Sequence, residues 1–215
     1  MKNINSTRRL TKLERLQFSL SDDLKNILVG LYLGDLYVQR RTKGSNAYLQ
    51  FAQGLVNKDY LEHLYELFKI YCYNAPNTTS MAPDKRTGEV YSRVRFHTYS
   101  LPCFNHLYDL FYPEGKKIVP LNIGELLTPI GIAYWIADDG CWIKSKRHVV
   151  LSTNSFTIKE VELLIEVLNN KFNLKSYICK QISGYQIIIP SYSVSVLQSL
   201  LAPVMPSAMK HKIGL

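Results

Sequence analysis

The chain has 215 residues, of which 47% are hydrophobic and 20% charged, a composition that predicts a folded protein of one domain or two small ones. Lys and Arg number 26 against 17 Asp and Glu, and the net charge of +9 favours a polyanionic partner, nucleic acid before an anionic membrane. The longest apolar stretch, residues 126–137, is too short to span a bilayer and contains Pro129, so we expect no membrane segment. A basic protein without any polyanionic partner remains the alternative.

The first 20 residues are basic and lack the hydrophobic core of a secretory signal. We expect a flexible basic N-terminal arm over residues 1–20, and an organellar presequence remains open.

The cysteines are predicted to be structural. Cys72, Cys103, Cys141 and Cys179 include no Cys-x-x-Cys pair and have no His at ligand spacing. We interpret them as buried, reduced thiols and not as a zinc site or a disulfide framework.

An apolar helical stretch opens the first half of the chain and runs into a single acid, Asp35. Alternating polar and apolar residues then predict strands, and apolar residues at helical spacing predict helices. The half closes on the lysine-bearing segment Gly115-Lys116-Lys117. The predicted elements are strands at 36–41, 48–53 and 90–97, and helices at 59–71 and from residue 100.

The second half repeats this order, with an apolar helix that ends on Asp139. Thr157 and Glu160 form a capping box that predicts the start of the next helix. The half closes on Met209-Lys210-His211-Lys212. The predicted elements are strands at 141–144, 148–153, 177–181 and 185–189, and helices at 157–172 and 193–201.

Since the order of elements occurs twice, we predict an α+β fold made of a duplicated α-β-β-α-β-β-α unit with pseudo-twofold symmetry. The expected divisions are an N-terminal half over 21–118, a connector over 119–127 and a C-terminal half over 128–215.

Small residues recur four apart in both apolar helices, Gly30 with Gly34 and Ala133 with Ala137. They predict a flat stripe on each helix against which another backbone packs closely. Two such helices side by side would bring the two terminal acids together, where the carboxylates repel each other and face the negative ends of helix dipoles. Because carboxylate oxygens suit hard cations, a divalent ion such as Mg²⁺ is the natural partner.

At this point the chain resembles the LAGLIDADG homing endonucleases in their single-chain form with two motifs. The resemblance covers residues 20–215 and departs from the family pattern at Leu36, which replaces the usual glycine, and at Leu33 and Ala137, where many members have an acid. It implies two saddle-shaped antiparallel sheets around two central packed motif helices, and a site-specific nuclease. The residues that carry it are Ala133-Tyr134-Trp135, Asp138-Asp139-Gly140 and Ser155-Phe156-Thr157.

The resemblance implies a catalytic pair of acids, Asp35 and Asp139, that bind Mg²⁺ or Mn²⁺. Backbone groups of Leu36 and Asp138 are expected to join them in the metal site. Divalent ions held by paired carboxylates can activate a water, stabilise the transition state and assist the leaving oxygen of a phosphodiester. One acid for each strand of a duplex would give a double-strand break.

Two lysines near the scissile phosphates are also implied. Lys117 matches the first by position, and Lys212 best matches the second, while a shift of the match selects Lys210 instead. Gln53 and Asn154 correspond to polar residues that order water around the metals.

The polar face of the strands is expected to lie in the DNA major groove, with further basic residues on phosphates. Because the two halves differ in sequence, we expect a long, asymmetric target in double-stranded DNA and a monomeric protein. The residues predicted to bind DNA are Tyr37, Gln39, Arg40, Arg41, Tyr91, Arg93, Arg95, His97, Lys116, Lys144, Lys146, Arg147, Lys175 and Lys180.

The main alternative is a group I intron maturase, an RNA-binding splicing cofactor that uses the same fold, alone or as a second activity. That hypothesis predicts loss of a catalytic acid, whereas both acids are present, and the same point disfavours a DNA-binding regulator built on an inactive nuclease. Richness in Lys, Asn, Ile and Tyr fits an AT-rich organellar genome, so a mitochondrial location is expected.

Overall fold

The computed structural model describes residues 9–42 and 44–215, which form two compact units. Unit 1 takes the described residues up to Leu20 together with Leu36–Tyr108, and unit 2 takes Ser21–Asp35 together with Asp109–Leu215. The chain therefore enters unit 2 for one helix, leaves it, and returns.

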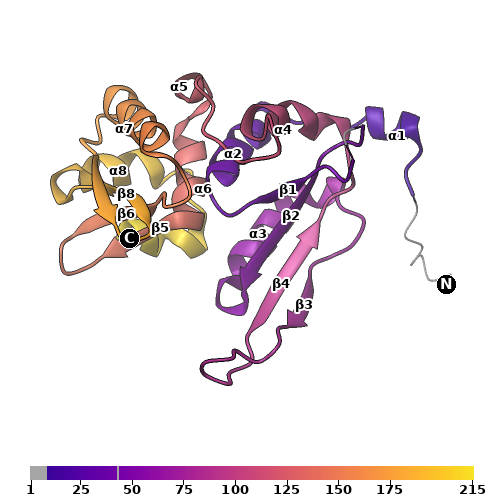
Figure 1. Cartoon of the computed structure of the whole chain (residues 1–215), viewed down its shortest axis with the longest axis horizontal. Coiled ribbons are helices and arrows are strands. Elements are labelled where there is room, and N and C mark those ends of the chain that lie inside the picture. Colours follow the sequence, from indigo (N-terminus) through magenta and orange to yellow (C-terminus); the bar gives the residue numbers. More distant parts are fainter. Residues whose placement is uncertain (1–8, 43) are drawn as a thin grey trace. The chain divides into compact units, whose positions relative to one another are not determined.

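Unit 1 contains a four-stranded antiparallel sheet in the order β1-β2-β4-β3, with α3 against β2 and β4 (Figure 1). Phe51 pairs with Phe96 across the sheet, and the two rings stack with their centroids 4.5 Å apart on the buried face. The buried face of α3 presents Leu61, Leu64 and Phe68. The bounds are α1 Lys12–Leu16, β1 Tyr37–Gln39, β2 Tyr48–Gly54, η1 Leu55–Asn57, α3 Lys58–Phe68, η2 Lys69–Tyr71, β3 Asn77–Ser80, β4 Ser92–His97 and η3 Pro102–Phe104.

Unit 2 contains the second sheet, in the equivalent order β5-β6-β8-β7, with α7 against β7 and β8. A capping box of Thr157 and Glu160 starts α7, as predicted, and Asn173 in the left-handed conformation ends it. The bounds are α2 Asp22–Leu33, α5 Ile123–Leu126, α6 Pro129–Asp139, β5 Gly140–Ile143, β6 His148–Ser152, α7 Ile158–Phe172, β7 Tyr177–Gln181, β8 Gly184–Ile189, η4 Ser191–Ser193, α8 Val194–Leu201 and η5 Ser207–Ile213. Helix α4, Asn105–Phe111, begins at the end of unit 1 and runs into unit 2.

The predicted α+β fold and its order of elements are confirmed, since both series read α-β-β-α-β-β-α. Two details of the first series differ from the prediction. The sequence did not predict strand β3, because its residues Asn-Thr-Thr-Ser include no apolar residue that alternates with the polar ones. Strand β4 begins at Ser92 and not at Val90, whose side chain is 58% exposed.

The motif helices α2 and α6 pack closely within unit 2. A Cβ placed on Gly30 would lie 1.9 Å from the carbonyl oxygen of Gly131, and one on Gly131 would lie 3.0 Å from that of Asn26. The predicted stripe on α2 is therefore correct at Gly30, but on α6 the small residue at the crossing is Gly131. Ala133 and Ala137 are buried without being that crossing point.

The close packing of α2 on α6 explains why the compact units differ from the predicted halves over 21–118 and 128–215. By contacts, the first motif helix groups with the second series, and the sheet that follows it forms its own unit.

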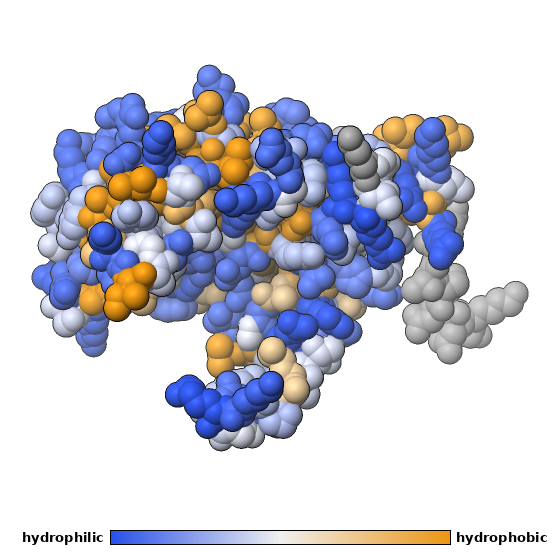
Figure 2. Space-filling model, viewed as in Figure 1, coloured by the Kyte–Doolittle hydropathy of each residue, from blue (hydrophilic) through white to orange (hydrophobic). Residues whose placement is uncertain are grey.

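The N-terminal segment is partly ordered in unit 1. Its residues 1–8 lie outside the described part, whereas α1 starts at a capping box of Thr11 and Glu14. Leu13 and Leu16 on α1 are 76% and 60% exposed and give the apolar surface over this helix in Figure 2. Over residues 9–42 and 44–215, no helix has the length and apolar character needed to cross a bilayer.

All four cysteines are free thiols, as predicted, but the prediction that they are buried is wrong: Cys72, Cys103 and Cys179 are half-buried, and Cys141 on β5 is exposed. Burial raises the pKa of the Cys72 thiol to about 12 and that of the Cys103 thiol to about 11.

Candidate active site and nucleic-acid interface

The two predicted acids lie at the C-terminal ends of α2 and α6. Gly34 caps α2 by donating its N–H to the Gly30 carbonyl, and the exposed Asp35 follows. Helix α6 continues through the half-buried Asp139 and is capped by Gly140. Gly140 is required there because a Cβ would lie 2.5 Å from the Ile136 carbonyl oxygen.

Asp138 links the two helix ends. Its Oδ2 accepts a hydrogen bond of 3.2 Å from the Asp35 backbone N–H. A Cβ on Gly34 would lie only 2.6 Å from the same oxygen, so the missing side chain leaves the space that this carboxylate fills. The sequence predicted a metal-binding role for the Asp138 backbone but not this contact of its side chain. The signal in the sequence was the difference between the two motifs: Gly34 precedes Asp35, whereas Asp138 precedes Asp139.

The two predicted lysines occupy equivalent positions beside the acids. Lys117 Nζ donates to the carbonyl oxygens of Leu33 at 3.2 Å and Gly34 at 2.6 Å, and Lys212 Nζ donates to that of Asp138 at 2.8 Å. Each ammonium thus bonds the carbonyl of the residue before an acid. This correspondence makes Lys212, and not Lys210, the structural counterpart of Lys117.

Each lysine is positioned by packing of the segment that carries it. The Glu160 carboxylate at the start of α7 accepts the Val119 N–H at 2.9 Å, and the Lys117 ammonium lies 5.4 Å from the centre of the buried Phe156 ring. Met209 and Ile213 of η5 are buried, and the Gln198 side chain donates to the Ile213 carbonyl at 2.8 Å.

The acids and lysines form one electrostatic cluster. Burial, and then the neighbouring charge of Asp35, raise the pKa of the Asp139 carboxyl to about 7, against the opposing effect of Lys117 and Lys212. Burial lowers the pKa of both lysine ammoniums, and the carboxylates of Asp35, Asp138 and Asp139 oppose that shift. The two lysines therefore compensate the acids only in part.

The donor set fits a divalent cation of the Mg²⁺ type. Asp35 and Asp139 supply hard carboxylate oxygens whose charge is incompletely neutralised, and a cation between them would remove their repulsion. The described residues contain no group of three or more His, Cys, Asp or Glu that could hold a metal ion. Mg²⁺ commonly binds one or two carboxylates together with substrate phosphates, so two acids suffice for it. The Asp138 carbonyl, predicted as a ligand, accepts a hydrogen bond from Lys212.

The two residues predicted to order water have local partners. The Asn57 amide donates to Gln53 Oε1 at 3.2 Å in unit 1, and the Asn154 amide donates to Ser183 at 2.8 Å in unit 2. Their roles beside a metal stay predictions, as does that of Leu36, whose side chain is buried.

The sheet of unit 1 carries polar side chains on the face opposite its core. Buried Leu49, Phe51, Val94 and Phe96 share the inner face, and strand register places the alternate residues on the other face. Arg93 and Arg95 lie opposite Gly54 and Ala52, which leave their guanidinium groups room. The predicted DNA-binding residues on this outer face are Tyr37, Gln39, Arg93, Arg95 and His97.

Two polar atoms on this outer face are buried without a partner. Thr79 lies opposite Arg93 in the register of β3 and β4, and both Arg93 Nε and Thr79 Oγ1 lack a hydrogen bond to the described residues. A buried donor or acceptor without a partner lowers the stability of the fold, so a polar ligand that bonds these two atoms would bind favourably here.

Arg40 does not share the outer face, and its role in DNA binding stays a prediction. Its guanidinium lies over the Tyr108 ring at 4.7 Å and donates to the Asn105 carbonyl at 3.4 Å, on the side of the buried Val38. Tyr91 precedes β4 and is exposed, and Arg41 follows β1 and is also exposed.

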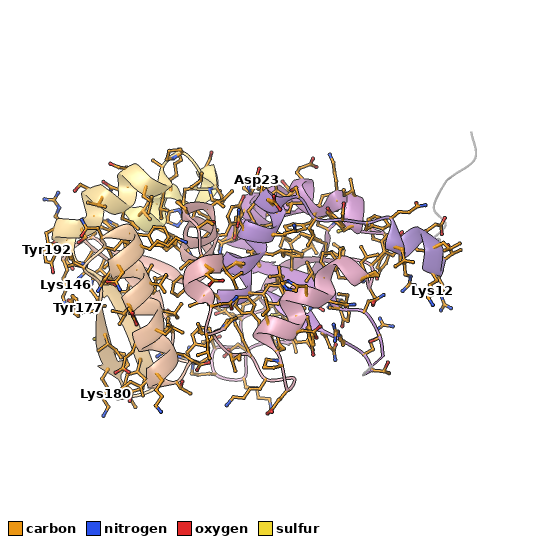
Figure 3. The ribbon with its side chains drawn as sticks, turned by 90° about the horizontal axis from the view of Figure 1, so that it is seen from above. Lys12, Asp23, Lys146, Tyr177, Lys180 and Tyr192 are labelled. Carbon is orange, nitrogen blue, oxygen red and sulfur yellow. The ribbon has the colours of Figure 1, made fainter. Side chains whose placement is uncertain are left out.

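The remaining predicted DNA-binding residues of unit 2 are exposed. Lys144, Lys146 and Arg147 form the β5–β6 turn, and Lys146, Tyr177 and Lys180 follow one another along the edge of this unit in Figure 3. Lys180 pairs with Tyr185 and so shares a face with buried Ile187, opposite to the face of Tyr177. Lys116 and Lys175 are also exposed.

The fold and the site together define a class of protein. It is a duplicated α+β protein with a paired-acid site that fits a divalent cation and with basic residues on a solvent-facing sheet. Residues 25–197 match the model of the LAGLIDADG DNA endonuclease family, and the chain belongs to this family.

Known proteins resemble the chain over most of its length. The cytochrome b mRNA maturase bI2 of Saccharomyces cerevisiae is 31% identical over 207 residues, which cover 91% of this chain and 48% of the maturase. The chain thus spans about half the length of that relative. The DNA endonuclease I-ChuI of Chlamydomonas applanata is 27% identical, with 91% of this chain and 96% of that protein covered. The solved structure of the homing endonuclease I-WcaI bound to its DNA recognition sequence superposes with a TM-score of 0.87 at 30% identity, covering 94% of this chain and 92% of that one.

Proposed function

We propose that this protein is a site-specific homing endonuclease that makes a metal-dependent double-strand break in a long, asymmetric DNA target. The observation that carries the proposal is the equivalence of the two acids, each followed by a strand and each with a lysine on the carbonyl just before it. Family membership and the similarity to a homing endonuclease bound to its recognition sequence support the same conclusion.

Asp35 and Asp139 would hold Mg²⁺, which supplies an activated water and charge stabilisation at the scissile phosphate. The lysines would have two roles of their own. Each would fix the turn that carries an acid, and each has N–H groups without a hydrogen-bond partner among the described residues, since an ammonium has three donors and Lys117 uses two and Lys212 one. Those remaining donors can stabilise the negative charge that develops on a phosphate in the transition state.

Binding of DNA would combine two sets of polar residues, the half-buried ones on the outer face of the unit 1 sheet and the exposed ones of unit 2. The outer-face arginines Arg93 and Arg95 are suited to bidentate contacts with base edges, each worth about 1–3 kcal/mol of discrimination. The lysines of the β5–β6 turn are suited to phosphates. Because the two sheets carry different side chains, one monomer would read two different half-sites.

Cleavage of a randomised duplex library in the presence of Mg²⁺ tests the proposal. The parent protein should cut a defined subset of sequences on both strands, and Asp35→Asn and Asp139→Asn should each abolish the break while keeping binding to the selected site in chelator. Asp23→Asn, an exposed acid on α2, is the matched control and should cut normally. A parent protein that leaves every duplex intact would overturn the proposal.

A maturase activity is the second candidate, because one relative at 31% identity is named as an mRNA maturase. Promotion of intron splicing by the Asp139→Asn protein would establish it separately from cleavage. The relatives named as cytochrome b mRNA maturases also support an organellar, mitochondrial setting for this protein.

A further inference from the structure

A hollow of about 440 Å³ in unit 1 lies between the N-terminal segment and the ends of β2 and β4. Arg9, Leu10 and Arg15 of α1 form one wall. The rest is lined by Arg41, Ser45, Tyr48, Tyr73 and residues 97–100. Its volume lies in the range of about 300–1,000 Å³ that is usual for ligand sites. None of the two acids and two lysines of the proposed active site lines it.

The pocket is positively charged without compensation. Arg9, Arg15 and Arg41 line it, no carboxylate does, and none of the three forms an ion pair with any residue in the described part of the chain. Arg15 bonds the carbonyls of Leu10 and Ser100, whereas Arg9 and Arg41 are exposed. Like charges around a concave surface focus the field and favour an anion.

The same pocket is lined by aromatic rings. Tyr73 lies with its ring centroid 4.8 Å from that of His97 and 5.4 Å from that of Tyr99, and the Arg41 guanidinium is 5.7 Å from the centre of Tyr48. Burial, and then the charge of Arg41, lower the pKa of the His97 imidazole and favour its neutral form. In the recognition of single strands, aromatic rings stack on bases while neighbouring arginines contact phosphates.

We propose that this pocket binds an unpaired nucleotide of a single nucleic-acid strand, with its phosphate on the arginines and its base against the tyrosines. A paired base cannot reach rings inside a pocket because it is stacked within the duplex, whereas an unpaired base can. The inference adds to the proposed cleavage of duplex DNA and needs neither of the two catalytic acids.

The test measures binding of short fluorescent single strands, one RNA and one DNA of the same sequence, to the full chain in chelator. Each strand carries one 2-aminopurine, whose emission falls when it stacks on an aromatic ring. We expect binding with quenching by the parent protein. Tyr99→Leu should weaken binding about tenfold and remove the quenching, as expected for loss of one stacked base. Tyr99→Phe, which keeps the ring, should bind as the parent does.

Charge is tested with Arg41→Gln, which should also weaken binding, against Arg86→Gln, which removes an exposed arginine that does not line the pocket. A stronger response from the RNA or from the DNA strand in the parent identifies the source of the nucleotide. If Tyr99→Leu binds and quenches like the parent, the pocket takes no base and the proposal is overturned, even where Arg41→Gln weakens binding.

Duplex cleavage and single-strand binding, both measured on the parent protein, separate this inference from the proposed function. A parent protein that binds single strands through Tyr99 but cuts no duplex would retain the pocket and reject the endonuclease. A parent protein that cuts duplex but does not bind single strands would support the endonuclease and reject the pocket as a nucleotide site.

Discussion

Replacement of Asp139 by asparagine should stabilise the metal-free protein while it abolishes cleavage. The carboxyl is half-buried, lies in the field of Asp35, and has its pKa raised to about 7 by burial and by that neighbour. Its ionisation therefore destabilises the folded state whenever no cation is bound. Asparagine has nearly the same shape and carries no charge, so the variant is free of that cost.

The size and sign of the effect follow from proton linkage. The folded protein keeps its proton on Asp139 up to about pH 7, whereas the unfolded chain releases it near 3.8, so the parent loses stability as the pH rises across this window. The full shift is about 3 units at about 1.4 kcal/mol each, which gives an upper limit of about 4 kcal/mol. The two lysines lose a counter-charge in the variant, so we expect a gain of about 1–3 kcal/mol at pH 8 and almost none at pH 4.

Urea unfolding at pH 4, 6 and 8 in chelator measures this difference directly. Asp23→Asn, which removes an exposed carboxylate from α2, is the control and should show no comparable growth of its stability difference with pH. A stability difference between Asp139→Asn and the parent that is the same at pH 4 and pH 8 would refute the electrostatic argument.

Three further predictions concern packing, catalysis and recognition. Gly30→Ala should lower the free energy of unfolding by about 3 kcal/mol or more because its Cβ would meet a backbone carbonyl at 1.9 Å, whereas Gly124→Ala, where the nearest atom is a side-chain carbon at 3.4 Å, should be tolerated in the same thermal melt. Lys212→Ala should slow cleavage of the selected duplex by about 10²–10³, as for loss of one transition-state donor. Lys210→Ala, its neighbour in η5, should change single-turnover rates little. Arg95→Gln should relax sequence preference in the selected library by about 1–3 kcal/mol at one base pair, and unchanged selectivity would remove it from base recognition.

Most of the fold was predictable because it depends on local periodicity. The alternation in β2 and β4 and the capping box at Thr157 predict elements that form as expected. Strand β3 escaped prediction because an exposed edge strand of Asn, Thr and Ser buries too little to show a period. Its position depends on pairing with β4, which is a long-range property.

The two acids and the two lysines could be identified from their place in the repeated order, but their surroundings could not. That Gly131 faces Gly30, and that the side chain of Asp138 fits beside Gly34, are consequences of helix register. Register is set by the whole helix crossing and not by the residues of either motif alone. Arg40 lies on the inner side of β1, as strict alternation after Val38 requires, but its contact with the Tyr108 ring depends on tertiary packing and could not be predicted from the strand pattern.

The connectivity of α2 has a consequence for synthesis of the chain. This helix leaves the ribosome roughly 100 residues before the glycine that accepts it, so its small-residue face stays bare while the first sheet is completed. A nascent chain stopped at residue 118 should therefore expose that face and depend on chaperones. We expect Asp35 and Asp139 to come together late in folding. Truncated products made during translation should therefore carry no nuclease activity.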